Sequence, residues 1–159
     1  DPSGLKYQVI WCCLLQRRGE HAKMTPFRLP LKVLFQHCDP AGIVFYPRYF
    51  EMINQTVEEW FEQDVGYSFA DMQARDNSGV PTVTLQTDFQ APSRLGERLV
   101  FELQVTKLGR TSLALTITAT GDEIQRLKAE LVLVYINKGT GRPMRWPDDV
   151  RAKIEGILA

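Results

Sequence analysis

The sequence predicts a single α+β domain, and three observations lead to that prediction. From Pro47 to about Gly66, apolar residues recur with the period of a helix. Between residues 82 and 137 they alternate with polar residues, as in half-buried strands. The 159 residues, 44% of them hydrophobic, suffice for one core without disulfides or metals. Because the long helix and most strands occupy separate stretches, an antiparallel α+β domain is expected.

The first element expected along the chain is a strand over residues 31–37. Apolar and polar residues alternate there, and the strand is expected to end at His37. A long amphipathic helix then begins at Pro47, with charged residues on its other faces. Its apolar stripe consists of Tyr49, Met52, Ile53, Thr56, Val57, Trp60 and Phe61. Gly66 is expected to end this helical region.

A short helix is expected next, because Ser68 and Asp71 resemble a capping box that would open a helix lasting to about Arg75. Four strands should follow, over about residues 82–89, 99–105, 113–119 and 127–137.

The two ends of this strand region carry further predictions. The last strand is apolar on both faces at its end, so it is expected to be central in the sheet or covered by another subunit. The residues concerned are Val132, Val134 and Ile136. A closing helix is expected from Asp148, with an apolar stripe of Val150, Ile154, Ile157 and Leu158.

Composition excludes several classes of function. Lys plus Arg equals Asp plus Glu, at 19 each, so no net field favours nucleic acid. Cys12, Cys13 and Cys38 are not spaced as metal ligands, and an odd number suits a reducing compartment, so we expect a cytoplasmic protein with no metal. The apolar stretch 9–15 is too short to span a bilayer, and no membrane association is expected.

Residues 1–23 are expected to form an N-terminal extension, either natural or added by cloning. The chain does not begin with Met, whereas Met24 stands directly before the patterned region. We therefore place the folded domain at residues 24–159.

The stretch from Phe35 to Phe50 carries the strongest indication of chemistry. Pro40 and Gly42 follow Asp39 and predict a turn, and the helix start at Pro47 comes soon after. The N–H groups of Phe45 and Tyr46 are expected to point outward there. Such donors, at the positive end of a helix dipole, stabilise an oxygen on which negative charge develops. Asp39 would then supply the attack on a carbonyl carbon.

The same residues resemble a known family. Cys38-Asp39-Pro40-Ala41-Gly42-Ile43-Val44-Phe45-Tyr46-Pro47 is similar to the signature of the 4-hydroxybenzoyl-CoA thioesterase family of hotdog-fold hydrolases. The resemblance implies a hotdog fold, in which an antiparallel sheet wraps around one long helix. It also implies hydrolysis of an acyl-CoA thioester, with Asp39 as nucleophile or general base and the Tyr46 backbone polarising the thioester carbonyl.

The resemblance extends to substrate-binding residues. Phe45 is expected to contact the substrate. Enzymes of the family that act on a hydroxylated benzoyl group carry an aspartate at the position of Asn54, so 4-hydroxybenzoyl specificity is in doubt, and an aryl or medium-chain acyl group is expected. The turn with Arg110, Thr111 and Ser112 matches the one that approaches the nucleotide end of CoA. Arg142 and Arg145 are second candidates for that contact.

The family also implies how the protein assembles and what it needs. Hotdog thioesterases form dimers with active sites at the subunit interface, and the dimers often pair into tetramers. A homodimer or homotetramer is therefore expected, with CoA entering only as part of the substrate and no other cofactor.

Other interpretations of the same residues stay open. Asp39 before a proline can cap a turn. His37 could serve as a base, but a hydrogen-bonded structural histidine is expected, and Cys38 could serve as a nucleophile, but a buried thiol is expected. Two rival functions are a hotdog hydratase or dehydratase and an acyl-CoA-binding module without activity. A thiol-release assay would separate them from hydrolysis.

Overall fold

The computed structural model describes residues 25–159. The expected N-terminal extension, with Cys12, Cys13 and the apolar stretch 9–15, lies outside the described residues. The strands are β1 (Phe27–Lys32), β2 (Ser78–Gly79), β3 (Thr82–Phe89), β4 (Arg98–Leu108), β5 (Ser112–Gly121), β6 (Ile124–Val134) and β7 (Ile136–Asn137). The helices are α2 (Tyr46–Trp60), α3 (Phe69–Ala74) and α4 (Asp148–Leu158).

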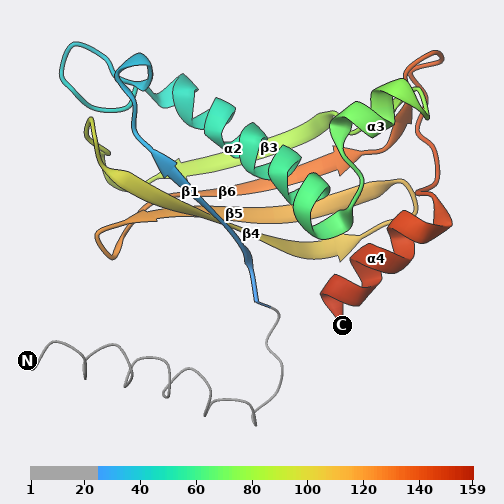
Figure 1. Ribbon diagram of the computed structural model, residues 1–159. Helices are drawn as coiled ribbons and strands as arrows, with labels where there is room; N and C mark the ends of the chain where they lie inside the picture. The colour runs from blue at the N-terminus through green and yellow to red at the C-terminus, as the bar shows by residue number, and fades with distance from the viewer. Residues whose placement is uncertain (1–24) are drawn as a thin grey trace, which may run out of the picture.

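The main sheet has five antiparallel strands in the order β1-β4-β5-β6-β3, and β2 pairs separately with β7. Helix α2 runs along one face of this curved sheet, while α3 and α4 lie at the end where α2 finishes (Figure 1). The predicted α+β hotdog architecture, a sheet wrapped around one long helix, is confirmed.

Helix α2 is held by the apolar stripe that the sequence predicts. Its buried side chains are those of Tyr49, Met52, Ile53, Thr56, Val57 and Trp60. They belong to one core with the inward residues of β4, β5 and β6. Each large apolar side chain buried in this way contributes roughly 1.5–3 kcal/mol. A π-helical turn, Phe61–Val65, continues the helix, and Gly66 ends it with φ of 73°.

The remaining helices also follow their expected signals. The Asp71 N–H donates to Ser68 Oγ at 3.0 Å, which confirms the predicted cap of α3. Helix α4 buries Val150 and Ile154 against the core. No helix within residues 25–159 combines the length and the apolar character needed to cross a bilayer.

The predicted first strand is wrong in its position. β1 pairs with β4 only as far as Lys32 opposite Arg98, and the Val33 N–H then donates to the Glu97 carbonyl at 2.8 Å. Beyond that point β4 offers no further partner, because the chain preceding it turns away. Residues Phe35–His37 instead form one turn of 3₁₀-helix, with the Phe35 side chain 84% exposed.

The end of the last long strand also differs from the prediction. β6 stops at Val134, and Ile136 belongs to β7, where it pairs with Gly79 of β2. Val132 and Val134 are half-buried. The expected central position is nevertheless confirmed, because β6 lies between β5 and β3.

Strand β3 is an edge of the main sheet and exposes apolar side chains. Val83, Leu85 and Phe89 are 58%, 39% and 47% exposed. The Thr87 Oγ1 atom is buried and makes no hydrogen bond with any described residue. An edge strand with exposed apolar groups is a surface on which another strand can pair.

A buried arginine organises the opposite end of the sheet from α4. Arg126 is 4% exposed, and its guanidinium binds the Glu97 carboxylate at 2.7 Å. It also donates to the carbonyl oxygens of Pro92 at 2.8 Å and Gly121 at 2.9 Å. A Cβ at Gly121 would lie 3.0 Å from the guanidinium, so glycine leaves room for it. These bonds fix the turn between β3 and β4.

The Arg126 contact also sets the charge state of its partner. The hydrogen bond from Arg126 holds the pKa of Glu97 below its ordinary value of 4.5. Because the folded pKa lies below the unfolded one, the ion pair stabilises the fold fully above about pH 4.5. This contribution is lost as the pH falls through the folded pKa.

We therefore expect Glu97→Gln to lower the free energy of unfolding at pH 7 by about 1–3 kcal/mol, because it leaves a buried guanidinium without its anion. The difference from the parent should shrink below about pH 4.5. Urea unfolding at pH 7 and at pH 3.5–4.5 measures both effects. Glu102→Gln, which breaks the exposed pair with Arg28, is the control and should cost less than about 1 kcal/mol. An equal loss at both pH values would contradict the assignment.

Candidate active site

The segment Cys38–Phe45 forms a tight loop between the 3₁₀ turn and α2. The Gly42 N–H donates to the Asp39 carbonyl at 2.9 Å, and the Asp39 N–H donates to the Ile43 carbonyl at 3.0 Å. Gly42 has φ of 78°, a left-handed conformation that a side chain would strain. The predicted turn after Asp39 is therefore confirmed, and the chain folds back past His37 before α2 begins.

This loop rests on the turn that Arg126 organises. The Val44 N–H donates to the Ser93 carbonyl at 2.9 Å, and the Leu95 N–H donates to the Gly42 carbonyl at 3.1 Å. Ser93 Oγ accepts a hydrogen bond from the buried Tyr49 hydroxyl of α2 at 2.8 Å. The loop is thus bonded to both the sheet and the helix, which gives it a defined position.

Asp39 is half-buried within this loop. One carboxylate oxygen, Oδ1, accepts the Ala41 N–H at 2.9 Å, as in the turn-capping interpretation. The other oxygen accepts no hydrogen bond from residues 25–159. The contact to Ala41 orients the carboxylate, and the second oxygen has the lone pairs needed to accept a proton or to attack a carbon.

The two backbone N–H groups expected to be free differ in the structure, and the expectation for Phe45 is wrong. The Phe45 N–H is not free, because it donates to the His37 carbonyl at 2.9 Å. The Tyr46 N–H is at the first position of α2, where no helical acceptor exists, and it has no acceptor elsewhere in the described part of the chain. Of these two N–H groups, only that of Tyr46 is therefore free to present the positive end of the helix dipole to an acceptor.

His37 has the structural role expected of it. Its Nδ1 accepts the Leu34 N–H at 2.9 Å, so this nitrogen carries no proton. Burial lowers the pKa of this imidazole, and the nearby Arg48 acts in the same direction while Glu51 opposes it. His37 thus closes the 3₁₀ turn before Asp39.

Cys38 is poorly suited to act as a nucleophile. Burial and the neighbouring Asp39 raise the pKa of its thiol, so the reactive thiolate is disfavoured. The sulfur lies 3.6 Å from the Leu34 carbonyl oxygen. Asp39 remains the candidate for the chemical step.

A shallow cavity of about 290 Å³ opens beside the start of α2. Its walls are Val44, Tyr46, Tyr49, Phe89, Gln90, Ala91 and Pro92. The Phe89 ring lies 5.7 Å from that of Tyr49 and 6.1 Å from that of Tyr46, measured between centroids. We name this surface the motif hollow. The sequence did not indicate that Phe89 and residues 90–92 belong to a site, because only the fold brings the end of β3 and the segment after it beside α2.

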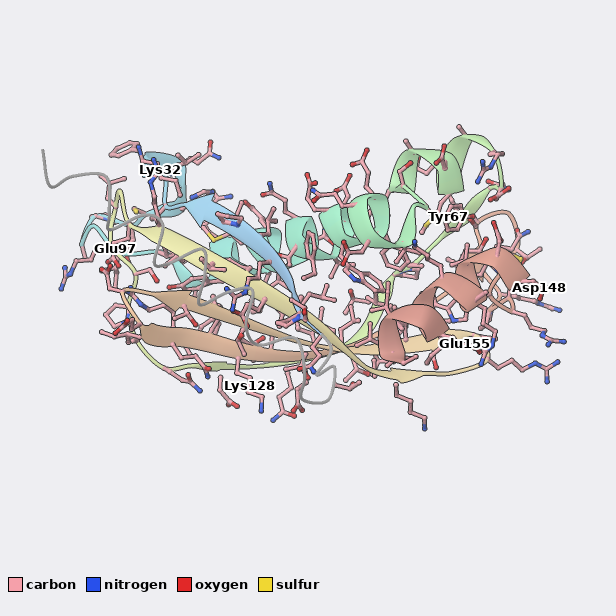
Figure 2. The ribbon with its side chains drawn as sticks, turned by 60° about the horizontal axis from the view of Figure 1, so that its bottom comes forward. Lys32, Tyr67, Glu97, Lys128, Asp148 and Glu155 are labelled. Atoms are coloured by element: carbon pink, nitrogen blue, oxygen red, sulfur yellow. The ribbon has the colours of Figure 1, made fainter. Side chains whose placement is uncertain are left out.

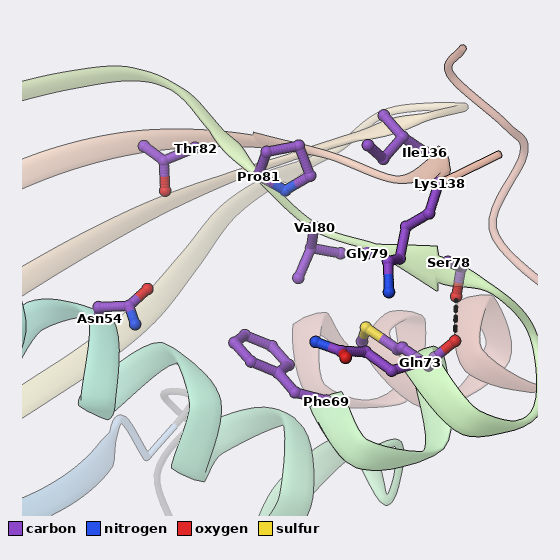
Figure 3. Close-up of a pocket in the computed structure, with 11 residues that line it drawn as sticks. Asn54, Phe69, Gln73, Ser78, Gly79, Val80, Pro81, Thr82, Ile136 and Lys138 are labelled. Carbon is purple, nitrogen blue, oxygen red and sulfur yellow. Dashed lines mark hydrogen bonds between the residues drawn. The ribbon is translucent and has the colours of Figure 1, made fainter. Parts of the chain in front are cut away.

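Asn54 belongs to a different cavity, of about 330 Å³, which we name the α3 cavity. It lies between α2, α3 and the segment that leads into β3 (Figure 3). Its walls are Asn54, Phe69, Met72, Gln73, Ser78, Gly79, Val80, Pro81, Thr82, Ile136 and Lys138. Phe89 ends β3 beside the motif hollow, whereas Thr82 begins it beside the α3 cavity, so the two cavities lie at opposite ends of one strand.

The expected CoA-binding turn lies at the α3 end as well. Arg110 is exposed, and its carbonyl accepts the Trp146 N–H at 3.3 Å. The Thr111 carbonyl accepts the Tyr135 N–H at 2.8 Å, and the Ser112 carbonyl accepts the Trp146 indole N–H at 3.2 Å. This turn is firmly attached to the C-terminal segment that also carries Arg142 and Arg145.

The expected site residues therefore separate into two groups within one chain. The loop with Asp39 and Phe45, and Tyr46 after it, bonds to the turn of residues 93–95, next to Glu97. Asn54 lines the α3 cavity with Thr82, and residues 110–112 follow the far end of β4. Figure 2 labels Glu97 toward one end of the molecule and Tyr67 toward the other. One chain does not bring the two groups together.

The described residues offer no metal-binding cluster. Within residues 25–159, no three His, Cys, Asp or Glu side chains gather closely enough to hold an ion. Near the start of α2, one oxygen of the Asp39 carboxylate and the Tyr46 N–H have no hydrogen-bond partner among the described residues.

Comparisons with known proteins agree with this arrangement. Residues 33–154 match the model of the thioesterase-like superfamily. The acyl-CoA thioester hydrolase YbgC of Escherichia coli O6:H1 is 25% identical over 132 residues, which are 82% of this chain and 97% of that protein.

Two solved structures share the fold. The 1,4-dihydroxy-2-naphthoyl-CoA thioesterase Slr0204 from Synechocystis superimposes with a TM-score of 0.76 at 20% identity, covering 85% of this chain and 99% of its own. Protein SAV2348 from Staphylococcus aureus, solved in complex with CoA, gives a TM-score of 0.79 at 16% identity, covering 87% of each chain.

Because the superfamily model spans most of the chain and the fold agrees with it, the chain belongs to the thioesterase-like superfamily, and the predicted class of enzyme, a thioester hydrolase, is confirmed.

Proposed function

We propose that this protein hydrolyses an aryl or medium-chain acyl-CoA to the free acid and CoA, with Asp39 as the reacting carboxylate. The observation that carries the proposal is an oriented carboxylate in the Cys38–Phe45 loop, followed at the start of α2 by the N–H of Tyr46, which has no acceptor within residues 25–159. A thioester carbonyl placed at the start of α2 would direct its oxygen to this N–H. The helix dipole behind that donor stabilises the oxyanion of the tetrahedral intermediate.

Two routes fit this arrangement. In the first, Asp39 takes a proton from water while the water oxygen bonds to the carbonyl carbon, and the carbon–sulfur bond then breaks to release the CoA thiolate. In the second, a carboxylate oxygen attacks the carbon directly, and water later cleaves the resulting anhydride. In both routes the thiolate leaves as a good leaving group and is protonated afterwards.

The comparisons support acyl-CoA as the substrate class. The E. coli relative is named for acyl-CoA thioester hydrolysis, and the S. aureus structure contains CoA. The exposed Arg110 guanidinium suits the phosphates of CoA. A reducing compartment suits the free Cys38 thiol, and we place the reaction in the cytoplasm.

We further propose that two copies of the chain assemble through β3. This edge strand exposes Val83, Leu85 and Phe89, and the backbone groups along its outer side pair with no other strand of residues 25–159. A two-fold axis near the middle of β3 would pair it antiparallel with a second copy. Backbone pairing and burial of these side chains would then stabilise the dimer. Association of dimers into tetramers stays a prediction.

Such a two-fold axis would unite the separated groups of site residues. Antiparallel pairing sets the Thr82 end of one β3 against the Phe89 end of the other. The α3 cavity of one copy, with Asn54, would then lie beside the motif hollow of the other, with Tyr46. Asp39 would act on an acyl group that the second copy binds, so each complete site needs both chains.

The first test removes the charge of Asp39. Asp39→Asn keeps an oxygen that can accept the Ala41 N–H, so the loop should fold normally. We expect kcat to fall about 10²- to 10⁴-fold in a thiol-release assay over a panel of acyl-CoAs, because the amide neither accepts a proton nor attacks carbon. Glu62→Gln, on the exposed face of the π-helical turn, is the control and should leave kcat unchanged.

Two outcomes would redirect the assignment. Turnover of Asp39→Asn near the parental rate would remove Asp39 from the chemistry. Binding of acyl-CoA by the parent without thiol release would favour a binding module or a hydratase, which a water-addition assay on unsaturated acyl-CoAs would separate.

The second test breaks the proposed β3 interface. Leu85→Asp introduces a charge at the centre of the edge without touching either cavity, so we expect monomers of 18.2 kDa and loss of nearly all turnover. Ile124→Asp, an exposed apolar position on the β5–β6 hairpin, is the control. Light scattering at assay concentrations measures the molecular mass of the parent and of both variants. A parent that is fully active as a monomer would refute the two-chain site.

A further inference from the structure

The α3 cavity has an apolar body and a polar rim. Phe69, Met72, Val80, Pro81 and Ile136 supply the apolar walls, and Met72 is 1% exposed. The amides of Asn54 and Gln73 and the Lys138 ammonium group lie at the exposed side. A cavity of this kind favours a ligand with an apolar middle and a polar end.

The rim of the α3 cavity carries a positive charge, that of Lys138. Among the described residues that line the cavity, Lys138 is the only charged one, and it forms no ion pair with any residue in the range 25–159. The nearby Asp76 carboxylate is engaged elsewhere, because it accepts the Tyr67 hydroxyl at 2.5 Å. The cavity therefore presents a positive charge whose partner the described part of the chain does not provide.

The backbone around Lys138 is firmly held. Its N–H donates to the Asn77 carbonyl at 2.9 Å, directly after the β2–β7 pairing of Gly79 with Ile136. A Cβ on Gly79 would lie 3.9 Å from Lys138 Cγ, so the stem of the side chain crosses the β2 backbone closely. Figure 3 shows the ammonium group directed past Gly79 toward Gln73.

The turn that follows is equally well bonded. The Asn137 side-chain oxygen accepts the N–H groups of Gly139 at 2.8 Å and Thr140 at 3.0 Å, and the Gly141 N–H donates to the Asn137 carbonyl at 2.7 Å. These bonds fix the position of the Lys138 backbone relative to the cavity.

We infer that the α3 cavity binds acyl groups whose far end carries a carboxylate or a similar anionic acceptor, held by Lys138 and the Gln73 amide. The inference rests on the proposed thioesterase function and adds the substrate class. Asn54 supplies an amide where an aspartate would repel such a group. A cationic substituent at the same place would face Lys138 and be disfavoured.

The test compares benzoyl-CoA, 4-carboxybenzoyl-CoA and 4-(aminomethyl)benzoyl-CoA as substrates of the full chain. We expect kcat/KM to be about five- to tenfold higher for the carboxyl compound than for benzoyl-CoA, and lowest for the amine. Lys138→Met should reduce the ratio of kcat/KM for 4-carboxybenzoyl-CoA to that for benzoyl-CoA to about one. Lys138→Glu should make the 4-(aminomethyl) compound a better substrate than the 4-carboxy compound. Lys153→Met, on the exposed face of α4, should keep the parental ratio.

Binding of the matching non-hydrolysable thioethers, S-benzyl-CoA and S-(4-carboxybenzyl)-CoA, separates this inference from the proposed function. Hydrolysis of benzoyl-CoA with no preference for the carboxyl group, or a preference that survives Lys138→Met, would overturn the inference and leave the function standing. A Lys138-dependent preference in thioether binding, without hydrolysis of any substrate, would support the inference as a binding property and refute the hydrolase.

Discussion

The packing of α2 against the curved sheet is the constraint on which the rest of the structure depends. Six buried side chains fix the rotation of the helix about its axis and its position along the strands. Interiors are packed as densely as organic crystals, so a buried helix cannot slide or turn without opening voids. The first residue of α2, Tyr46, and a residue two turns later, Asn54, are therefore fixed relative to the sheet. The motif hollow and the α3 cavity both take one wall from this helix.

The loop before α2 draws its order from bonds that begin far away in the sequence. Arg126 of β6 binds Glu97, Pro92 and Gly121, and the turn fixed in this way then accepts the Val44 N–H through Ser93. Burying a guanidinium is costly unless its donors are satisfied, and here charged and carbonyl partners satisfy them. Asp39 thus gains a defined orientation from groups that take no part in the chemistry.

The edge strand β3 connects the fold to the proposed assembly. Its exposed apolar residues lie along an edge that α2 does not cover fully, and both cavities open next to this strand. The same pairing would therefore remove an exposed edge and complete two sites. Lys138 lies on the rim of one cavity. In the proposed dimer it would meet the acyl group of a substrate placed beside Asp39 of the other copy.

Much of the fold and part of the site could be predicted from local patterns. The α2 stripe, the glycine at position 66, the Ser68 cap and the alternation of β4 and β5 are set by neighbours along the chain, and these appear as expected. Strand β3 alternates in the same way, yet its apolar side chains are exposed, because it lies at the edge of the sheet. The turn after Asp39 follows from Pro40 and Gly42 for the same reason. The available Tyr46 N–H follows from its place at a helix start, where no helical acceptor precedes it.

The predictions were wrong where hydrogen-bond partners distant in the sequence determine the local structure. Residues 31–37 alternate like a strand, yet β1 ends at Lys32, because β4 supplies hydrogen-bond partners no further. The Phe45 N–H is not free, because the loop folds back and this group donates to the His37 carbonyl.

What the sequence alone determined is the class of fold, the order of its elements and the turn after Asp39, since these depend on local spacing and turn chemistry. Only the tertiary structure decided that Asp39 and Asn54 lie toward opposite ends of β3, that Arg126 orders the loop, and that Lys138 faces the α3 cavity. Each of these depends on strand register and packing, and such contacts join residues too far apart in the chain for local patterns to record.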